Sequence, residues 1–64
     1  MIAEDMVGNI LVQGDYVVHP SGARGTVFHV GTDSATLSQR SVIVRIDEAR
    51  LTAKAHTLTR IEAL

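Results

Sequence analysis

Hydrophobic and polar residues alternate most regularly over residues 41–46 and again over residues 51–55, with a polar turn at 47–50 between them. Alternation with a period of two is the pattern of a half-buried β-strand, so the two segments predict a hairpin. In the register that we expect, every inward-facing pair is apolar, which specifies the pairing strongly. The expected pairs are Ile46 with Leu51, Val44 with Ala53, and Val42 with Ala55.

A second hairpin is predicted upstream, with strands at Tyr16–His19 and Gly25–Val30. Both segments are rich in β-branched and aromatic residues, and the Pro20-Ser21-Gly22 sequence between them is typical of a turn. Gly25 indicates either a β-bulge or the close approach of another backbone. Simple alternation cannot place all the apolar residues of this hairpin on one face, so their facing stays open. These residues are Val17, Val27, Phe28 and Val30.

The remaining segments are less regular. Residues 31–40 are polar and rich in Ser and Thr, and they predict a loop of about ten residues with Leu37 tucked beneath it. Residues 1–13 predict an N-terminal arm or short strand, because 1–9 mix apolar and acidic residues without a period, as in a frayed arm or a turn of helix. Residues 14–64 are then expected to form the main folded unit.

A helix is the alternative for the C-terminal part of the chain. Residues 47–64 contain Leu51, Ala55, Leu58 and Ile61 at helical spacing. Threonine and histidine, which are mediocre helix formers, are frequent in the same span. We therefore favour a strand over residues 51–55, followed by a tight turn and a last short strand. Five short strands separated by turn signals predict an all-β fold, a small five-stranded barrel that is closed or half closed.

Composition changes this picture in one respect. A chain of 64 residues buries only about 60% of its unfolded surface, so its core is thin. The chain has no cysteine, which excludes disulfides and thiolate metal ligands and fits a reducing compartment. Because 45% of the residues are nevertheless hydrophobic, we expect some apolar surface to be covered by a second copy of the chain.

The charge balance disfavours a nucleic-acid partner. Six Lys and Arg residues stand against seven Asp and Glu residues, with no block of like charge, whereas nucleic-acid binders gather a basic excess on one face. The N-terminal segment lacks the basic start of a signal peptide. No stretch approaches the roughly 20 apolar residues of a membrane span. We therefore expect a cytoplasmic protein without membrane contact.

The sequence contains no clear pattern of metal-binding, catalytic or phosphate-binding residues. The three histidines, His19, His29 and His56, lack the spacing of metal ligands, and no serine lies in a nucleophile-elbow context. Gly22-Ala23-Arg24-Gly25 lacks the Lys-Ser/Thr and the helix of a phosphate-binding loop. We expect no cofactor, no metal and no catalytic residue.

Two short motifs carry a family resemblance. Gly14-Asp15-x-Val17, followed after a turn by Gly25-Thr26-Val27, resembles the opening hairpin of SH3-like small barrels, including KOW and Tudor-type modules. The spacing is similar to that in the Tudor-like modules of UvrD-type helicase tails and CarD-type transcription factors. The later pattern, 42–47 and then Leu58-x-x-Ile61, is similar to the last strands of the photosystem accessory subunit PsaE. The resemblance implies an SH3-like barrel.

The sequence therefore predicts a non-catalytic interaction module that binds a protein partner, itself, or both. Loops and rims on a rigid barrel are the usual places for recognition. The alternatives are a nucleic-acid- or transcription-associated Tudor/KOW module and a small oligomeric enzyme with an active site shared between subunits. The candidate binding residues are Tyr16, His19, Arg24, Phe28, Leu37, Gln39 and Arg40.

Overall fold

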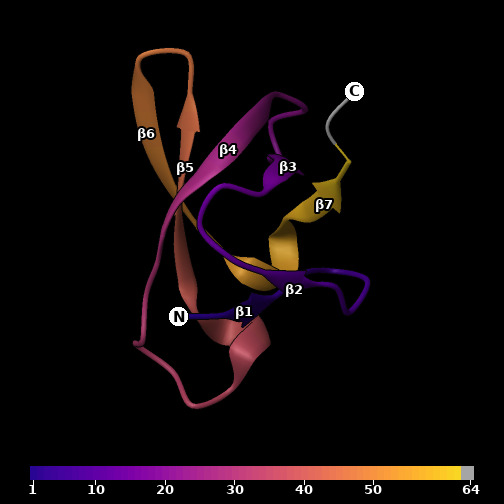
Figure 1. Ribbon diagram of the computed structural model, residues 1–64, viewed down its shortest axis with the longest axis vertical. Coiled ribbons are helices and arrows are strands. Elements are labelled where there is room, and N and C mark those ends of the chain that lie inside the picture. The colour runs from indigo at the N-terminus through magenta and orange to yellow at the C-terminus, as the bar shows by residue number, and fades with distance from the viewer. Residues whose placement is uncertain (63–64) are drawn as a thin grey trace.

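The strands of the computed structural model, which describes residues 1–62, form two antiparallel sheets (Figure 1). The smaller sheet pairs β1 (Ala3–Glu4) with β2 (Ile10–Leu11). The larger sheet has the order β6-β5-β4-β3-β7. Its strands are β3 (Tyr16–Val18), β4 (Arg24–Val30), β5 (Ser41–Ile46), β6 (Ala49–Lys54) and β7 (Thr59–Ile61). Two single 3-10 turns complete the fold, η1 (Leu37–Gln39) and η2 (Ala55–Thr57).

The all-β prediction is confirmed, whereas the helical alternative is wrong over residues 47–62. That segment forms β6, the turn η2 and β7, as the strand interpretation predicts. Residues 63 and 64 of the predicted main unit lie outside the described residues. Strands β6 and β7 are the two edges of the larger sheet and do not pair within residues 1–62, so the sheet is open there.

The β5–β6 hairpin is confirmed, but the expected register is wrong by two residues. The turn contains only Asp47 and Glu48, with Asp47 at a φ of 54°, where Asp is tolerated better than most residues. Because side chains alternate with period two, a slip of two residues keeps every side chain on its predicted face. The observed pairs are Ile46 with Ala49, Val44 with Leu51, and Val42 with Ala53.

Strand β4 contains a bulge at Phe28, which settles the facing of the first hairpin. Val27 pairs with Val44, but His29 pairs with Ile43, so one extra residue of β4 lies between the two pairs. The bulge lets Val27 and Val30, three residues apart, both point into the core. Phe28 is left on the outer face, where 37% of it is exposed.

Gly25 marks a close backbone approach, one of the two options that the sequence predicts. A Cβ atom at this position would lie 2.5 Å from the carbonyl oxygen of Arg45 and 2.7 Å from Cγ1 of Val44. Real Cβ atoms do not approach backbone oxygens so closely. Only glycine therefore lets β4 approach β5 this closely.

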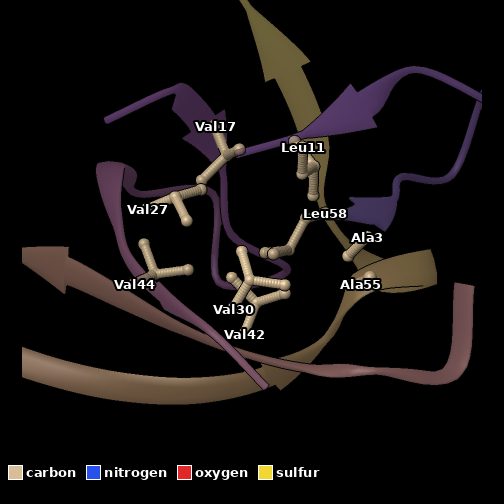
Figure 2. Close-up of a cluster of buried hydrophobic side chains, with 9 residues drawn as sticks. All are labelled: Ala3, Leu11, Val17, Val27, Val30, Val42, Val44, Ala55 and Leu58. Atoms are coloured by element: carbon tan, nitrogen blue, oxygen red, sulfur yellow. The ribbon is translucent and has the colours of Figure 1, made fainter. Parts of the chain in front are cut away.

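The core is made only of aliphatic side chains. It lies between the inner face of the larger sheet, the β1–β2 hairpin and η2 (Figure 2). The buried residues are Ala3, Leu11, Val17, Val27, Val30, Val42, Val44, Ala55 and Leu58. The single Tyr and the single Phe of the chain are both exposed. This is a costly arrangement for a domain with so thin a core, because aromatic residues bury more apolar area than any other type.

The first twelve residues contain the two short strands β1 and β2, which Asp5 organises as a hairpin. Its Oδ1 accepts hydrogen bonds from the backbone N–H groups of Val7 (3.0 Å) and Asn9 (2.7 Å). Its Oδ2 accepts from the side chain of Asn9 (3.2 Å) and from the backbone N–H of Arg60 in β7 (2.7 Å). One carboxylate thus closes the β1–β2 turn and fastens it to β7.

The charge of Asp5 is maintained despite its burial. Only 2% of the residue is exposed, and this burial by itself raises the pKa. The hydrogen bonds from Arg60, Asn9 and Val7 outweigh it and hold the pKa below the ordinary value of 3.8. The folded state therefore binds its proton less readily than the unfolded chain does.

The predicted loop 31–40 is confirmed and is held by its own polar contacts. Asp33 accepts hydrogen bonds from the Ser41 hydroxyl (2.6 Å) and the Ser41 backbone N–H (2.8 Å), and it pairs with Lys54 (3.1 Å). These bonds from Ser41, together with the Lys54 ammonium, hold the pKa of Asp33 well below its ordinary value. The loop is thereby anchored to β5 and β6.

Acid stability should depend on Asp5. Because its pKa is lower in the folded state, its contribution is complete above the unfolded pKa of 3.8 and is lost as the pH falls through the folded value. We expect Asp5→Asn to lower the free energy of unfolding at pH 7 and to flatten its loss below about pH 4. Urea titrations between pH 2 and 7 measure both effects. Glu48→Gln, which changes an exposed carboxylate in the β5–β6 turn, should leave the Asp5 contribution in place, and an unchanged acid profile in Asp5→Asn contradicts this role.

A methyl group at position 25 should destabilise the sheet. Gly25→Ala forces its Cβ against the backbone of β5, and overpacking of this kind costs about 1–3 kcal/mol. Thr32→Ala, a substitution to the same residue type in the exposed loop, should change the free energy of unfolding by less than about 0.5 kcal/mol. Chemical denaturation at pH 7 compares the two. Equal stability of both variants would refute the close approach of β4 and β5.

Candidate functional site

A row of side chains crosses the outer face of the five-stranded sheet, from β7 to β6. Paired residues in adjacent strands point to the same side of a sheet, and here the pairing is continuous across all five strands. Tyr16 pairs with Ile61 on one side and with Thr26 on the other. Thr26 pairs in turn with Arg45, and Arg45 with Arg50.

Part of this face is hollowed into an open groove with a volume of about 670 Å³. Strands β3, β4 and β5, which lie side by side in Figure 1, supply most of its surface. The lining residues are Gln13, Gly14, Tyr16, Arg24, Gly25, Thr26, Val27, Phe28, Arg45 and Asp47.

Arg50 extends the site onto β6. Its guanidinium carbon lies 4.1 Å from the centre of the Phe28 ring, a cation–π contact that fixes both side chains. We use the name aromatic–arginine face for the five residues Tyr16, Arg24, Phe28, Arg45 and Arg50. They combine two exposed rings with three cationic groups on one side of the sheet.

The three arginines of this face lack carboxylate partners within residues 1–62, where only two salt bridges form. The other basic side chains are engaged. Lys54 pairs with Asp33 at 3.1 Å, and Arg60 lies 3.8 Å from Asp15. Arg40 donates to the backbone oxygens of Ser34 (2.8 Å) and Ile2 (2.9 Å). Within residues 1–62, three of the six Lys and Arg residues of the chain thus lie together on the aromatic–arginine face without a carboxylate partner.

Arg45 and Arg50 face each other directly across β5 and β6. Like charges in opposite cross-strand positions destabilise a sheet. The Arg50 guanidinium lies over Phe28, and Nε of Arg45 donates to the backbone oxygen of Asp47 (3.3 Å). Neither contact neutralises a charge, so folding alone does not account for this pair.

The structure brings three of the seven candidate residues together, namely Tyr16, Arg24 and Phe28. His19 lies in the β3–β4 turn, where its Nδ1 contacts the Ser21 hydroxyl (2.9 Å) and accepts from the Ser21 backbone N–H (3.1 Å). The other three candidates, Leu37, Gln39 and Arg40, are at η1, which packs beside β1 and η2 rather than at the groove. Their role in binding stays a prediction.

Sequence reasoning missed Arg45 and Arg50 as members of the site. In the expected register Arg45 would pair with Thr52, and Arg50 would lie in the turn. A two-residue turn at Asp47 and Glu48 brings both arginines onto adjacent strands. The signal that could have found them is Asp47, because Asp tolerates the left-handed backbone conformation that it adopts here. This tolerance permits the shorter turn that pairs Arg45 with Arg50.

A second exposed surface is the outer side of the β1–β2 hairpin. Ala3 and Leu11 point into the core, so their sequence neighbours point outward. The exposed large apolar residues of this hairpin are Met1, Ile2, Met6, Val7, Ile10 and Val12. We call this set the hairpin patch. Its apolar character is typical of a protein contact surface.

Other site chemistries find little support in the described part of the chain. Within residues 1–62, no group of three or more His, Cys, Asp or Glu side chains is placed to hold a metal ion. No helix in the same range is long and apolar enough to cross a membrane.

Comparison with protein-family models, with curated proteins and with solved structures finds no match to this chain. The aromatic–arginine face and the hairpin patch are therefore the two features of the molecule that bear on its function.

Proposed function

We propose that the chain is a non-catalytic interaction module, built on an SH3-like small barrel, that binds a protein partner at the groove of its aromatic–arginine face. One observation carries this proposal. The chain has one Tyr, one Phe and no Trp, and both rings are exposed on the same face, by 47% and 37%. Exposed aromatic residues and arginines are the side chains most enriched at binding hot spots.

The strand order supports the barrel assignment. Strands β3 to β6 follow one another as a meander, and β7 then returns to pair with β3. This return curls the sheet around the aliphatic core, which is the arrangement expected of a small half-closed barrel. The Gly14–Val17 and Gly25–Val27 segments that resemble SH3-like modules form the β3–β4 hairpin at the centre of this sheet.

The groove fits a polypeptide better than a small molecule. It is open, and its lining includes the polar residues Gln13 and Thr26 beside the two aromatic residues. The two polar residues offer hydrogen bonds to a peptide main chain, while Tyr16 and Phe28 offer apolar contact. A site for a small molecule normally encloses most of its ligand.

Selection from a displayed library of random linear peptides tests this function. We expect enrichment of peptides whose affinity falls at least tenfold in Phe28→Ala and in Tyr16→Ala, because truncation of a hot-spot aromatic costs 2 kcal/mol or more. Met6→Ser, which changes an exposed apolar residue outside the groove, serves as the control and should bind as wild type does. Failure to enrich any peptide, or equal affinity in all four proteins, contradicts the proposal.

Self-association is a second proposed role, and the hairpin patch favours it. Six large apolar side chains are exposed within residues 1–12, and exposed apolar residues that gather on one surface mark interaction sites. We expect light scattering at about 0.1 mM to show the molar mass of a dimer or higher oligomer. The double variant Met6→Ser/Val7→Ser should show a lower average molar mass at the same concentration. The matched variant Tyr16→Ser should have the same oligomeric state as the wild-type protein. A strict monomer at high concentration rules out this role.

A further inference from the structure

Within residues 1–62, the positive charges of the three arginines on the aromatic–arginine face take part in no ion pair that would stabilise the fold. Arg45 and Arg50 stand opposite each other on neighbouring strands, and Arg24 shares the groove with Arg45. Within residues 1–62 no carboxylate lies within salt-bridge distance of any of the three. A small domain that retains a like-charged cross-strand pair gives up stability for it, and such departures from folding consistency concentrate at functional sites.

We propose that this face recognises an acidic, extended segment of a partner protein, whose carboxylates bind Arg45, Arg50 and Arg24. The inference rests on the proposed function and specifies the chemistry of its ligand. Guanidinium groups bind carboxylates through two parallel N–H···O bonds, a geometry that lysine cannot reproduce. A carboxylate between Arg45 and Arg50 converts their repulsion into a shared attraction.

The spacing of the arginines specifies the spacing of the acids. Arg24 is two residues along β4 from Thr26, the partner of Arg45, so it is a diagonal neighbour of Arg45. Diagonal neighbours in a sheet lie about 7–8 Å apart. Alternate side chains of an extended peptide are about 6.5–7 Å apart. A peptide with acidic residues at positions i and i+2 therefore reaches both places at once.

Arg50 is held ready for such a ligand. Its guanidinium lies over the Phe28 ring, with Cζ 4.1 Å from the ring centre. Stacking on a ring leaves the N–H groups at the edge of the guanidinium free to donate. Because the side chain is already ordered, carboxylate binding loses less conformational entropy than it would with a free arginine.

Single-stranded nucleic acid, the other polyanion to consider, fits the same face less well. Its bases need rings to stack on, but Arg50 covers one side of Phe28, which leaves Tyr16 as the one uncovered ring of the face. Asp47 lines the groove beside Arg45, and Glu48 follows it in the turn. A nucleic acid carries a phosphate at every nucleotide, so a phosphate would lie next to these carboxylates and be repelled by them. A peptide can have a neutral residue at that position.

Fluorescence anisotropy with three labelled probes of about twelve units tests the inference. The first is a peptide with Glu at alternate positions and Thr between them, the second has Gln in place of every Glu, and the third is oligothymidylate. We expect the Glu peptide to bind wild-type protein at least tenfold tighter than either of the others. Its affinity should fall with added salt, because exposed charge pairs are screened.

Three arginine variants locate the contact. Arg45→Gln and Arg50→Gln should each weaken the Glu peptide at least fivefold. Arg60→Gln, which removes the same charge from β7, should bind within twofold of wild type. Arg45→Gln should not lower the melting temperature at low salt, because it removes a like-charge pair. Weakened binding with intact stability separates recognition from folding.

The outcomes that overturn the inference are distinct from those that overturn the proposed function. Equal binding of the Glu and Gln peptides, tighter binding of oligothymidylate, or an equal effect of Arg60→Gln and Arg45→Gln refutes acidic-peptide recognition. If library selection still yields peptides that depend on Tyr16 and Phe28, the interaction module stands without its acidic ligand. If no peptide is enriched and the Glu peptide does not bind, both proposals fail.

Discussion

Strand β4 has to satisfy two requirements that a regular strand cannot meet together. Val27 and Val30 are both needed in the core, although an odd spacing normally places two residues on opposite faces. The bulge at Phe28 resolves the conflict, and it simultaneously leaves Phe28 on the outer face. Gly25 provides the second adjustment by letting β4 lie unusually close to β5. The core and the candidate site thus depend on the same irregular strand.

Much of the sheet could be predicted from the sequence because its strands alternate clearly. The faces of Val42 and Val44 were predictable even though their partners were not, since a slip of two residues preserves sidedness. The register itself depends on the length of the turn. Turn length follows from the backbone conformation of a single residue, Asp47, and the apolar pattern does not report it.

The N-terminal hairpin was not predictable for a different reason. Its strands have two residues each, too few to show any period. It exists because Asp5 gathers hydrogen bonds from its own turn and from Arg60, 55 residues away. A hydrogen bond from a distant backbone N–H does not depend on the side chain of the donor residue, so the pattern of hydrophobic and polar residues does not reveal it. The sequence shows an acidic residue in an irregular segment, which is equally typical of a solvated arm.

The candidate site was predictable only in part, and the missing part follows from the register. Tyr16, Arg24 and Phe28 could be proposed from their chemistry and their place in one hairpin. Scattered arginines become a cluster only when β5 and β6 are paired correctly, which places Arg45 opposite Arg50. Three of the six Lys and Arg residues, which are dispersed along the sequence, then lie on one face beside the single Tyr and the single Phe.

The most direct test of this account is the NMR titration of ¹⁵N-labelled protein with the alternating Glu peptide, observing backbone amides and arginine Nε–H groups together. The account predicts saturable shifts at Tyr16, Thr26 and Phe28 and at the Nε–H groups of Arg45 and Arg50. The amides of Val7 and Ile10 in the hairpin patch should not move. Shifts that are confined to the hairpin patch, or that spread equally over Arg40 and Arg60, would contradict it.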